Sequence, residues 1–229
     1  MKLIFIHGAG NTGFVWYHQL KHFPDADALS LPGHPEGQPY TSIEGYADWL
    51  HEYILQCKYS APILIGHSMG GGVAQTYALK YPKDVSALVL IGTGARLRVN
   101  PDFLDLIRAG LGQPPDYMRN LLNPLYGTVE PWLRDRVIEK ITEIGVRVQL
   151  NDFQCCDKFD IMDKIQSINL PTLIICGTQD DMTPVKYSKY LANNIDGSSL
   201  IIVEGATHMV FMEKPDEVNK AIEDFNRSL

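Results

Sequence analysis

The sequence feature that most constrains the fold is a sharp turn between an apolar run and a helical stretch, within ILIGHSMGGGVAQTYALKYP at residues 63–82. The turn, GHSMG, carries Ser68 at its centre and a glycine two positions away on either side, Gly66 and Gly70. A strand that turns this abruptly into a helix strains the backbone of the central serine, and only very small residues fit at the two flanking positions. The spacing alone arises easily by chance, but the strand before it and the helix after it predict an exposed serine hydroxyl at the end of a strand.

Other apolar runs, bounded by glycine, proline or polar residues, indicate a parallel sheet. Several lack any alternation of apolar and polar residues, which is typical of strands covered on both faces. Helical stretches separate the runs, so we expect an α/β fold, a three-layer α/β/α sandwich with a mostly parallel sheet of about six strands. The expected strands span residues 2–6, 27–31, 62–66, 86–92, 171–177 and 199–205.

Two helices that cover this sheet can be placed from their patterns. Residues 41–57 predict a helix that opens with Thr41 and Glu44 at capping-box spacing. A closing helix is predicted from Pro215, a residue suited to a first helical position. The apolar face of the first helix is expected to contain Ile43, Ala47, Leu50 and Ile54.

The alternation of strands and helices stops after about residue 95. Prolines punctuate apolar helical patterns here, and no convincing strand occurs among them. We therefore expect a helical cap at residues 96–157, inserted into a core made of residues 1–95 and 158–229. Helices inserted at this point of the chain can cover a functional site.

The residues that would activate Ser68 are expected further along the chain. A serine hydroxyl becomes a good nucleophile when a histidine accepts its proton, and a carboxylate then orients that histidine. In a parallel sheet such partners are expected at the carboxyl ends of later strands. Asp180 follows the fifth expected strand and His208 the sixth, and His208 is the only histidine that follows both Ser68 and Asp180. Asp181 remains the alternative acid.

A glycine-rich loop near the start, FIHGAGNTG at residues 5–13, allows two interpretations. Its glycines match the G-x-G-x-x-G spacing of a dinucleotide-binding turn, whereas its His-Gly opening is typical of an oxyanion hole in hydrolases. The bulky run at residues 14–17, and Ser30 in place of an acidic residue at the end of the second strand, weaken the dinucleotide interpretation. We expect the backbone N–H groups of Ala9 and Met69 to hold an oxyanion.

Composition excludes several other classes of protein. The net charge of −7, without a basic run, disfavours a nucleic-acid partner. The four cysteines lack the C-x-x-C spacing of zinc or redox motifs and are expected to be free thiols. We expect no metal and no cofactor. No apolar run is long enough to span a membrane and the first residues do not resemble a signal peptide, so we expect a cytoplasmic protein without a membrane partner. The oligomeric state is left open.

Taken together, these motifs resemble the α/β-hydrolase fold family over nearly the whole chain. The resemblance implies a serine carboxylesterase with Ser68, Asp180 and His208 as its catalytic triad and a helical cap. It also implies a small form that lacks the first two strands of the family, and Ser30 departs from the aspartate common in the family before the LPGH motif. The motifs that carry the resemblance are HGAG at 7–10, LPGH at 31–34, GHSMGG at 66–71, GTQDDMTP at 177–184 and GATH at 205–208.

The function expected from these residues is hydrolysis of carboxylic esters of short to medium acyl chain through an acyl-enzyme intermediate, with a small-molecule ester and water as partners. A lyase or a carbon–carbon bond hydrolase would use the same triad. A non-catalytic ligand receptor could carry the triad without turnover. An oxidoreductase that binds NAD through the glycine-rich loop is the alternative from a third class.

Overall fold

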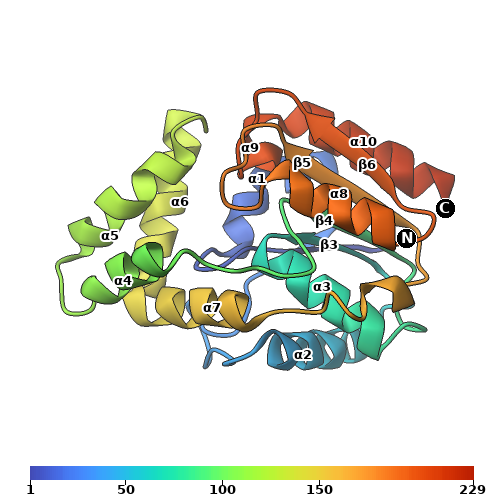
Figure 1. Cartoon of the computed structure of the whole chain (residues 1–229), viewed down its shortest axis with the longest axis horizontal. Coiled ribbons are helices and arrows are strands. Elements are labelled where there is room, and N and C mark those ends of the chain that lie inside the picture. The colour runs from blue at the N-terminus through green and yellow to red at the C-terminus, as the bar shows by residue number, and fades with distance from the viewer.

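A computed structural model describes all residues, 1–229, and contains one sheet of six parallel strands (Figure 1). The strands follow the order β2-β1-β3-β4-β5-β6 across the sheet. This confirms the expected α/β fold class. The strands are β1 (Leu3–Ile6), β2 (Asp27–Leu29), β3 (Ile63–His67), β4 (Ala87–Ile91), β5 (Thr172–Gly177) and β6 (Ser199–Val203).

Helices cover both faces of the sheet and complete the three layers. The helices α2 (Ile43–Gln56), α3 (Met69–Lys80) and α8 (Val185–Asn194) pack on one face. The opposite face is covered by α1 (Tyr17–His22), α9 (Val210–Glu213) and α10 (Pro215–Ser228). Every residue of β1, β3, β4 and β5 is buried, which explains why these strands are continuous apolar runs in the sequence.

The predicted amphipathic helices are present, with one correction at a helix start. All four residues of the expected apolar face of α2 are buried. The helix is capped by Ser42 and not by Thr41, because the Ser42 hydroxyl accepts the hydrogen bond from the backbone N–H of Gly45 at 3.1 Å. The last helix begins at Pro215 as expected.

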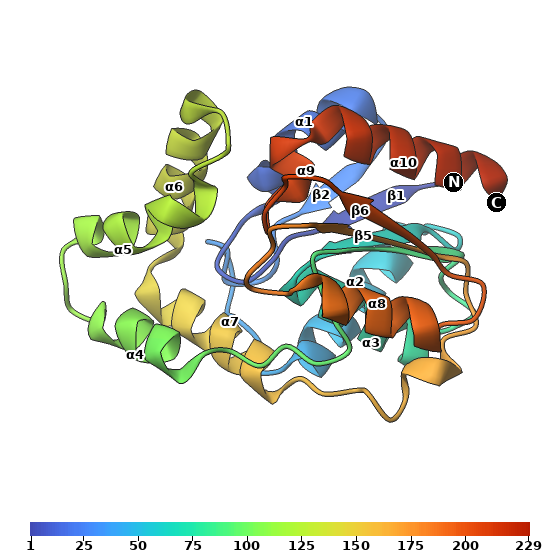
Figure 2. The same cartoon turned by 45° about the horizontal axis from the view of Figure 1, so that its top comes forward.

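Between β4 and β5 the chain forms four helices, α4 (Pro101–Ala109), α5 (Pro115–Leu122), α6 (Pro131–Ile144) and α7 (Val146–Lys158). The first three begin with a proline, whose fixed φ and missing N–H suit the first helical position. Both views place this group beyond the carboxyl ends of the strands (Figures 1 and 2). Short 3-10 helices complete the chain: η1 (Gly13–Trp16), η2 (Asn123–Tyr126) and η3 (Ile165–Ser167).

The strand order places a functional site at a defined point of the sheet. After β1 the chain moves to β2 on one side, and it then returns to form β3 on the other side of β1. The loops that leave β1 and β3 therefore diverge, and in open parallel sheets ligands bind in the crevice that such a change of direction creates.

None of the helices has the length and apolar character needed to cross a lipid bilayer.

Candidate active site

Ser68 lies in the turn between β3 and α3, in a backbone conformation that few residues adopt. Its φ of 51° and ψ of −116° confirm the strained turn expected from the sequence. A Cβ atom on Gly66 would lie 2.2 Å from the carbonyl oxygen of Gly70, and one on Gly70 would lie 2.2 Å from that of Ile6. The two glycines are therefore needed for the close approach of strand and helix that presents Ser68.

Asp180 follows β5 and is 4% exposed. Its Oδ1 accepts hydrogen bonds from the backbone N–H groups of Met182, at 2.9 Å, and Thr183, at 2.8 Å, and its Oδ2 accepts one from the Thr183 hydroxyl at 2.8 Å. Burial alone would raise the pKa of Asp180. The charge of His208 and the hydrogen bonds from His208 and Thr183 outweigh burial and hold the pKa below its usual value.

His208 follows β6 and is 8% exposed. Its Nδ1 lies 2.9 Å from Oδ2 of Asp180. Because the pKa of Asp180 is lowered, its carboxylate is an acceptor, and Nδ1 of His208 carries the proton of this hydrogen bond. The other ring nitrogen, Nε2, is left available as a base. Asp181, the alternative acid, is exposed and makes no hydrogen bond to His208.

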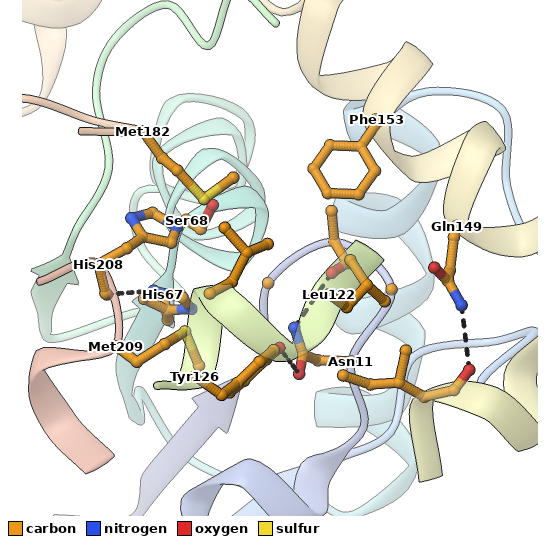
Figure 3. Close-up of a pocket in the computed structure, with 15 residues that line it drawn as sticks. Asn11, His67, Ser68, Leu122, Tyr126, Gln149, Phe153, Met182, His208 and Met209 are labelled. Carbon is orange, nitrogen blue, oxygen red and sulfur yellow. Dashed lines mark hydrogen bonds between the residues drawn. The ribbon is translucent and has the colours of Figure 1, made fainter. Parts of the chain in front are cut away.

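The Ser68 and His208 side chains meet in one cavity of about 40 Å³. Figure 3 shows them on one side of this cavity, with Phe153 and Gln149 on the other. No hydrogen bond joins the Ser68 hydroxyl to His208 in this structure, and the Ser68 Oγ is not among the buried polar atoms. The hydroxyl is therefore accessible from the cavity and beside the imidazole that Asp180 orients.

His67 packs behind His208 and holds its backbone. The two rings lie 4.6 Å apart, and Nε2 of His67 lies 3.0 Å from the carbonyl oxygen of His208. Since a carbonyl can only accept, Nε2 carries the proton. Burial, together with electrostatic repulsion from the neighbouring His208 ring, lowers the pKa of His67 well below its usual value. His67 is thus a neutral donor that fixes the loop of His208.

Two backbone N–H groups near Ser68 have no acceptor within the chain. Ala9 lines the cavity in the loop after β1, and its N–H makes no hydrogen bond, whereas that of Gly10 does. Met69 is the first residue of α3, where N–H groups have no partner inside the helix. These are the two amides that the sequence predicted for an oxyanion hole, and both are free to bind an anionic oxygen.

A second, larger cavity opens on the other side of Ser68. It has a volume of about 330 Å³ and shares Ser68, Leu125, Phe153 and Met182 with the smaller cavity. Its remaining lining mixes apolar and polar side chains and contains three charged residues, Arg98, Asp181 and Lys186. Ser68 therefore lies where two cavities of unequal size meet.

No group of three or more His, Cys, Asp or Glu side chains is arranged to hold a metal ion.

The sequence did not reveal two polar residues on one face of α7. Gln149 is 1% exposed and lines the smaller cavity; its Nε2 donates to the Ile141 carbonyl, and its Oε1 has no hydrogen-bond partner. Asp152, three residues later, accepts the hydrogen bond from Gly10 N–H at 2.8 Å. That bond occupies one amide of the glycine-rich loop, which further weakens the interpretation of this loop as a pyrophosphate-binding turn. No sequence pattern marks either residue.

Comparison with known proteins assigns the chain to a family. A family model described as the alpha/beta hydrolase family matches residues 3–221, nearly the whole chain. The chain belongs to the alpha/beta hydrolase family. This match confirms the resemblance noted in the sequence.

Named members of the alpha/beta hydrolase family resemble the chain along most of its length. The monoacylglycerol lipase abhd6-A of Xenopus laevis is 28% identical over 257 residues, covering 100% of this chain and 76% of the relative. A pimeloyl-[acyl-carrier protein] methyl ester esterase of Neisseria meningitidis serogroup A is 28% identical over 242 residues, with 98% and 76% covered. A solved structure described as a thermophilic esterase is 32% identical, with a TM-score of 0.82 and coverage of 99% and 89%.

Proposed function

We propose that this alpha/beta hydrolase cleaves carboxylic esters, with Ser68 as nucleophile, His208 as general base and acid, and Asp180 as the carboxylate that orients His208. Relatives named as esterases and as a lipase support ester hydrolysis as the reaction class. The observation that carries the residue roles is the buried hydrogen bond of 2.9 Å between His208 Nδ1 and Asp180 Oδ2, beside the strained and accessible Ser68.

In the proposed mechanism, His208 Nε2 takes the proton from the Ser68 hydroxyl as the Ser68 oxygen attacks the ester carbonyl carbon. The tetrahedral intermediate collapses when His208 returns that proton to the alcohol oxygen, which leaves as a neutral alcohol. Water then attacks the acyl-enzyme, giving its proton to His208, and the carboxylic acid departs as Ser68 regains a proton. The low pKa of Asp180 keeps its carboxylate charged beside the imidazolium that forms in each step.

The negative oxygen of both tetrahedral intermediates is assigned to the amides of Ala9 and Met69. These groups have no other acceptor, so they need no rearrangement when charge develops on the oxygen. A single oxyanion donor of this kind is typically worth about 10²- to 10³-fold in rate.

The two cavities beside Ser68 support a division of the substrate into two arms. We assign the acyl arm to the smaller cavity, because about 40 Å³ gives room for roughly three groups of the size of water. The larger cavity, with charged residues along its wall, suits the alcohol, which must leave before water can enter. The small volume of the first cavity favours short acyl chains, at the lower end of the short-to-medium range expected from the sequence. We also assign residues 96–157 as the cap, since Leu122, Leu125 and Phe153 come from this segment.

Replacement of the three proposed catalytic residues tests this function. With p-nitrophenyl acetate as substrate, Ser68→Ala, His208→Ala and Asp180→Asn are each expected to lower kcat by about 10⁴-fold or more. The matched comparison is Asp181→Asn, which changes the neighbouring acid and should cost less than tenfold. Retention of ester turnover by Ser68→Ala, or an equal loss in Asp180→Asn and Asp181→Asn, would refute the proposed roles.

A further inference from the structure

Asp152 is a fully buried carboxylate, 0% exposed, on a helix that lies outside the sheet. It belongs to α7, which reaches from the inserted helices towards α2 and α3 (Figure 1). Its Oδ2 accepts the hydrogen bond from Gly10 N–H at 2.8 Å and lies 2.7 Å from His34 Nε2. Its Oδ1 accepts the hydrogen bond from the Tyr46 hydroxyl at 3.0 Å. One side chain of α7 thus joins three segments that are distant in sequence.

The neighbours of the His34 ring determine where its protons lie. Nδ1 of His34 faces the carbonyl oxygens of Leu31, at 3.0 Å, and Pro32, at 3.1 Å, so it must donate. Burial lowers the pKa of His34, but the hydrogen bond and charge of Asp152 outweigh burial and raise the pKa above its usual value. Asp152 therefore favours the protonated form of His34, and the buried hydrogen bond between them keeps its geometry because neither group can be left without its partner.

His7 holds the other end of the glycine-rich loop. Its Nε2 accepts the hydrogen bond from Leu31 N–H at 3.0 Å, so Nδ1 carries the proton and donates to the Gly8 carbonyl at 2.8 Å. The Gly8 carbonyl and the Gly10 amide are both occupied by side chains, and the N–H of Ala9 between them is the group left free. The direction of this one amide is therefore set by its two neighbours.

We propose that Asp152 is a positioning residue that holds the Gly10 amide and thereby aims the Ala9 N–H at the oxyanion. This inference rests on the proposed function, because it assumes that the Ala9 amide binds the oxygen of a reacting ester. Asp152 acts through the loop and does not touch the substrate. His34 supplies the positive charge that balances Asp152, since an uncompensated carboxylate behind the loop would oppose the negative charge of the oxyanion. Asp152 thus links the position of α7 to the orientation of the Ala9 N–H in the oxyanion hole.

The test compares Asp152→Asn with the wild type in kcat, KM and binding of a trifluoromethyl ketone. This probe reacts reversibly: the Ser68 oxygen adds to the ketone carbon, the Ser68 proton passes to His208, and the former carbonyl oxygen becomes an oxyanion on the two amides. We expect Asp152→Asn to lower kcat about 10- to 100-fold, with KM within threefold. The affinity for the ketone should fall by a similar factor. The affinity for the corresponding alcohol, which forms no oxyanion, should stay within twofold.

Two control variants separate positioning from general stability. Asp27→Asn removes a carboxylate at the start of β2 that accepts hydrogen bonds from Lys2, Tyr53 and Tyr59, and it should lower the melting temperature with kcat within twofold. Tyr46→Phe disturbs the Asp152 cluster but keeps the Gly10 bond, so its loss of kcat should be at least fivefold smaller than that of Asp152→Asn.

The Asp152 variants test the positioning role, and Ser68→Ala tests the proposed ester hydrolysis separately. The inference is overturned if folded Asp152→Asn loses less than fivefold in kcat, if it weakens the alcohol as much as the ketone, or if Tyr46→Phe matches it. Should Asp152→Asn fail to fold, His34→Gln replaces it, with kcat and ketone affinity expected to fall together by at least threefold, and smaller changes overturn the inference. Ester turnover by Ser68→Ala would instead refute the proposed function, whatever the Asp152 variants do.

Discussion

Three buried histidines show how a single hydrogen-bond partner decides the direction in which a pKa shifts. His7 and His67 each face a carbonyl oxygen with one ring nitrogen and are fully buried, so they are held neutral. His34 faces carbonyl oxygens with one nitrogen and the Asp152 carboxylate with the other, so its pKa is raised and its protonated form is favoured. Burial is common to all three, and the presence of a carboxylate decides the outcome.

The neutral state of His7 predicts a pH dependence of stability. Burial, reinforced by the charge of His34, lowers the pKa of His7 to about 3, whereas an unfolded histidine titrates near about 6.5. Between these values the unfolded chain takes up a proton that the native protein does not, so stability falls as the pH falls. The free-energy difference between wild type and His7→Asn should shrink by up to about 1.4 kcal/mol per pH unit below pH ~6.5.

Urea unfolding of the two proteins at pH 7.5, 6.0 and 4.5 measures this difference. His67 and His34 are present in both proteins, so their own contributions largely cancel. A difference that stays constant from pH 7.5 to 4.5 would show that His7 is not held neutral in the native state.

At the scale of elements, the helices between β4 and β5 contribute the side chains that limit the proposed acyl arm. Leu122, the last residue of α5, is 5% exposed and lines the smaller cavity but not the larger one. The side chain of its neighbour Leu121 is half-buried and lines neither. These two leucines form a matched pair, because each truncation to alanine removes the same atoms.

Leu122→Ala should therefore change chain-length preference. We expect kcat/KM for p-nitrophenyl butyrate, relative to acetate, to rise about tenfold or more, because room for one or two methylenes in an apolar pocket is worth about 1–3 kcal/mol. Leu121→Ala should leave that ratio within about twofold. If both variants shift the ratio equally, or if Leu122→Ala leaves it unchanged, the acyl arm does not occupy the smaller cavity.

The pattern of the sequence predicted the elements that carry Ser68, Asp180 and His208 for a simple reason. Parallel strands end at the same edge of a sheet, so residues that follow β3, β5 and β6 lie near one another wherever the strands occur in the sequence. Asp152 lies in an inserted helix, and its burial depends on how α7 packs against the loop after β1. Spacing along one chain segment carries no information about such packing, which explains why this residue was missed.

In the whole molecule, two parts of the chain contribute to one site. The sheet supplies the nucleophile, the base, the acid and the free amides, while the inserted helices supply cavity walls and the carboxylate of Asp152. The N-cap of α2 shows that a sequence pattern does not decide between two adjacent residues that both suit a cap. Thr41 and Ser42 both suit a helix start, and it is the Ser42 hydroxyl that accepts the hydrogen bond from Gly45 N–H.

Mapping a covalent adduct shows which residue of the protein is the nucleophile. A fluorophosphonate reacts when an activated serine displaces fluoride from phosphorus, and the product remains bound to the serine oxygen. Mass spectrometry of the digested protein should find a single adduct, on Ser68, and none in Ser68→Ala. An adduct on another residue, or an unmodified Ser68 in protein that turns over esters, would show that Ser68 is not the nucleophile.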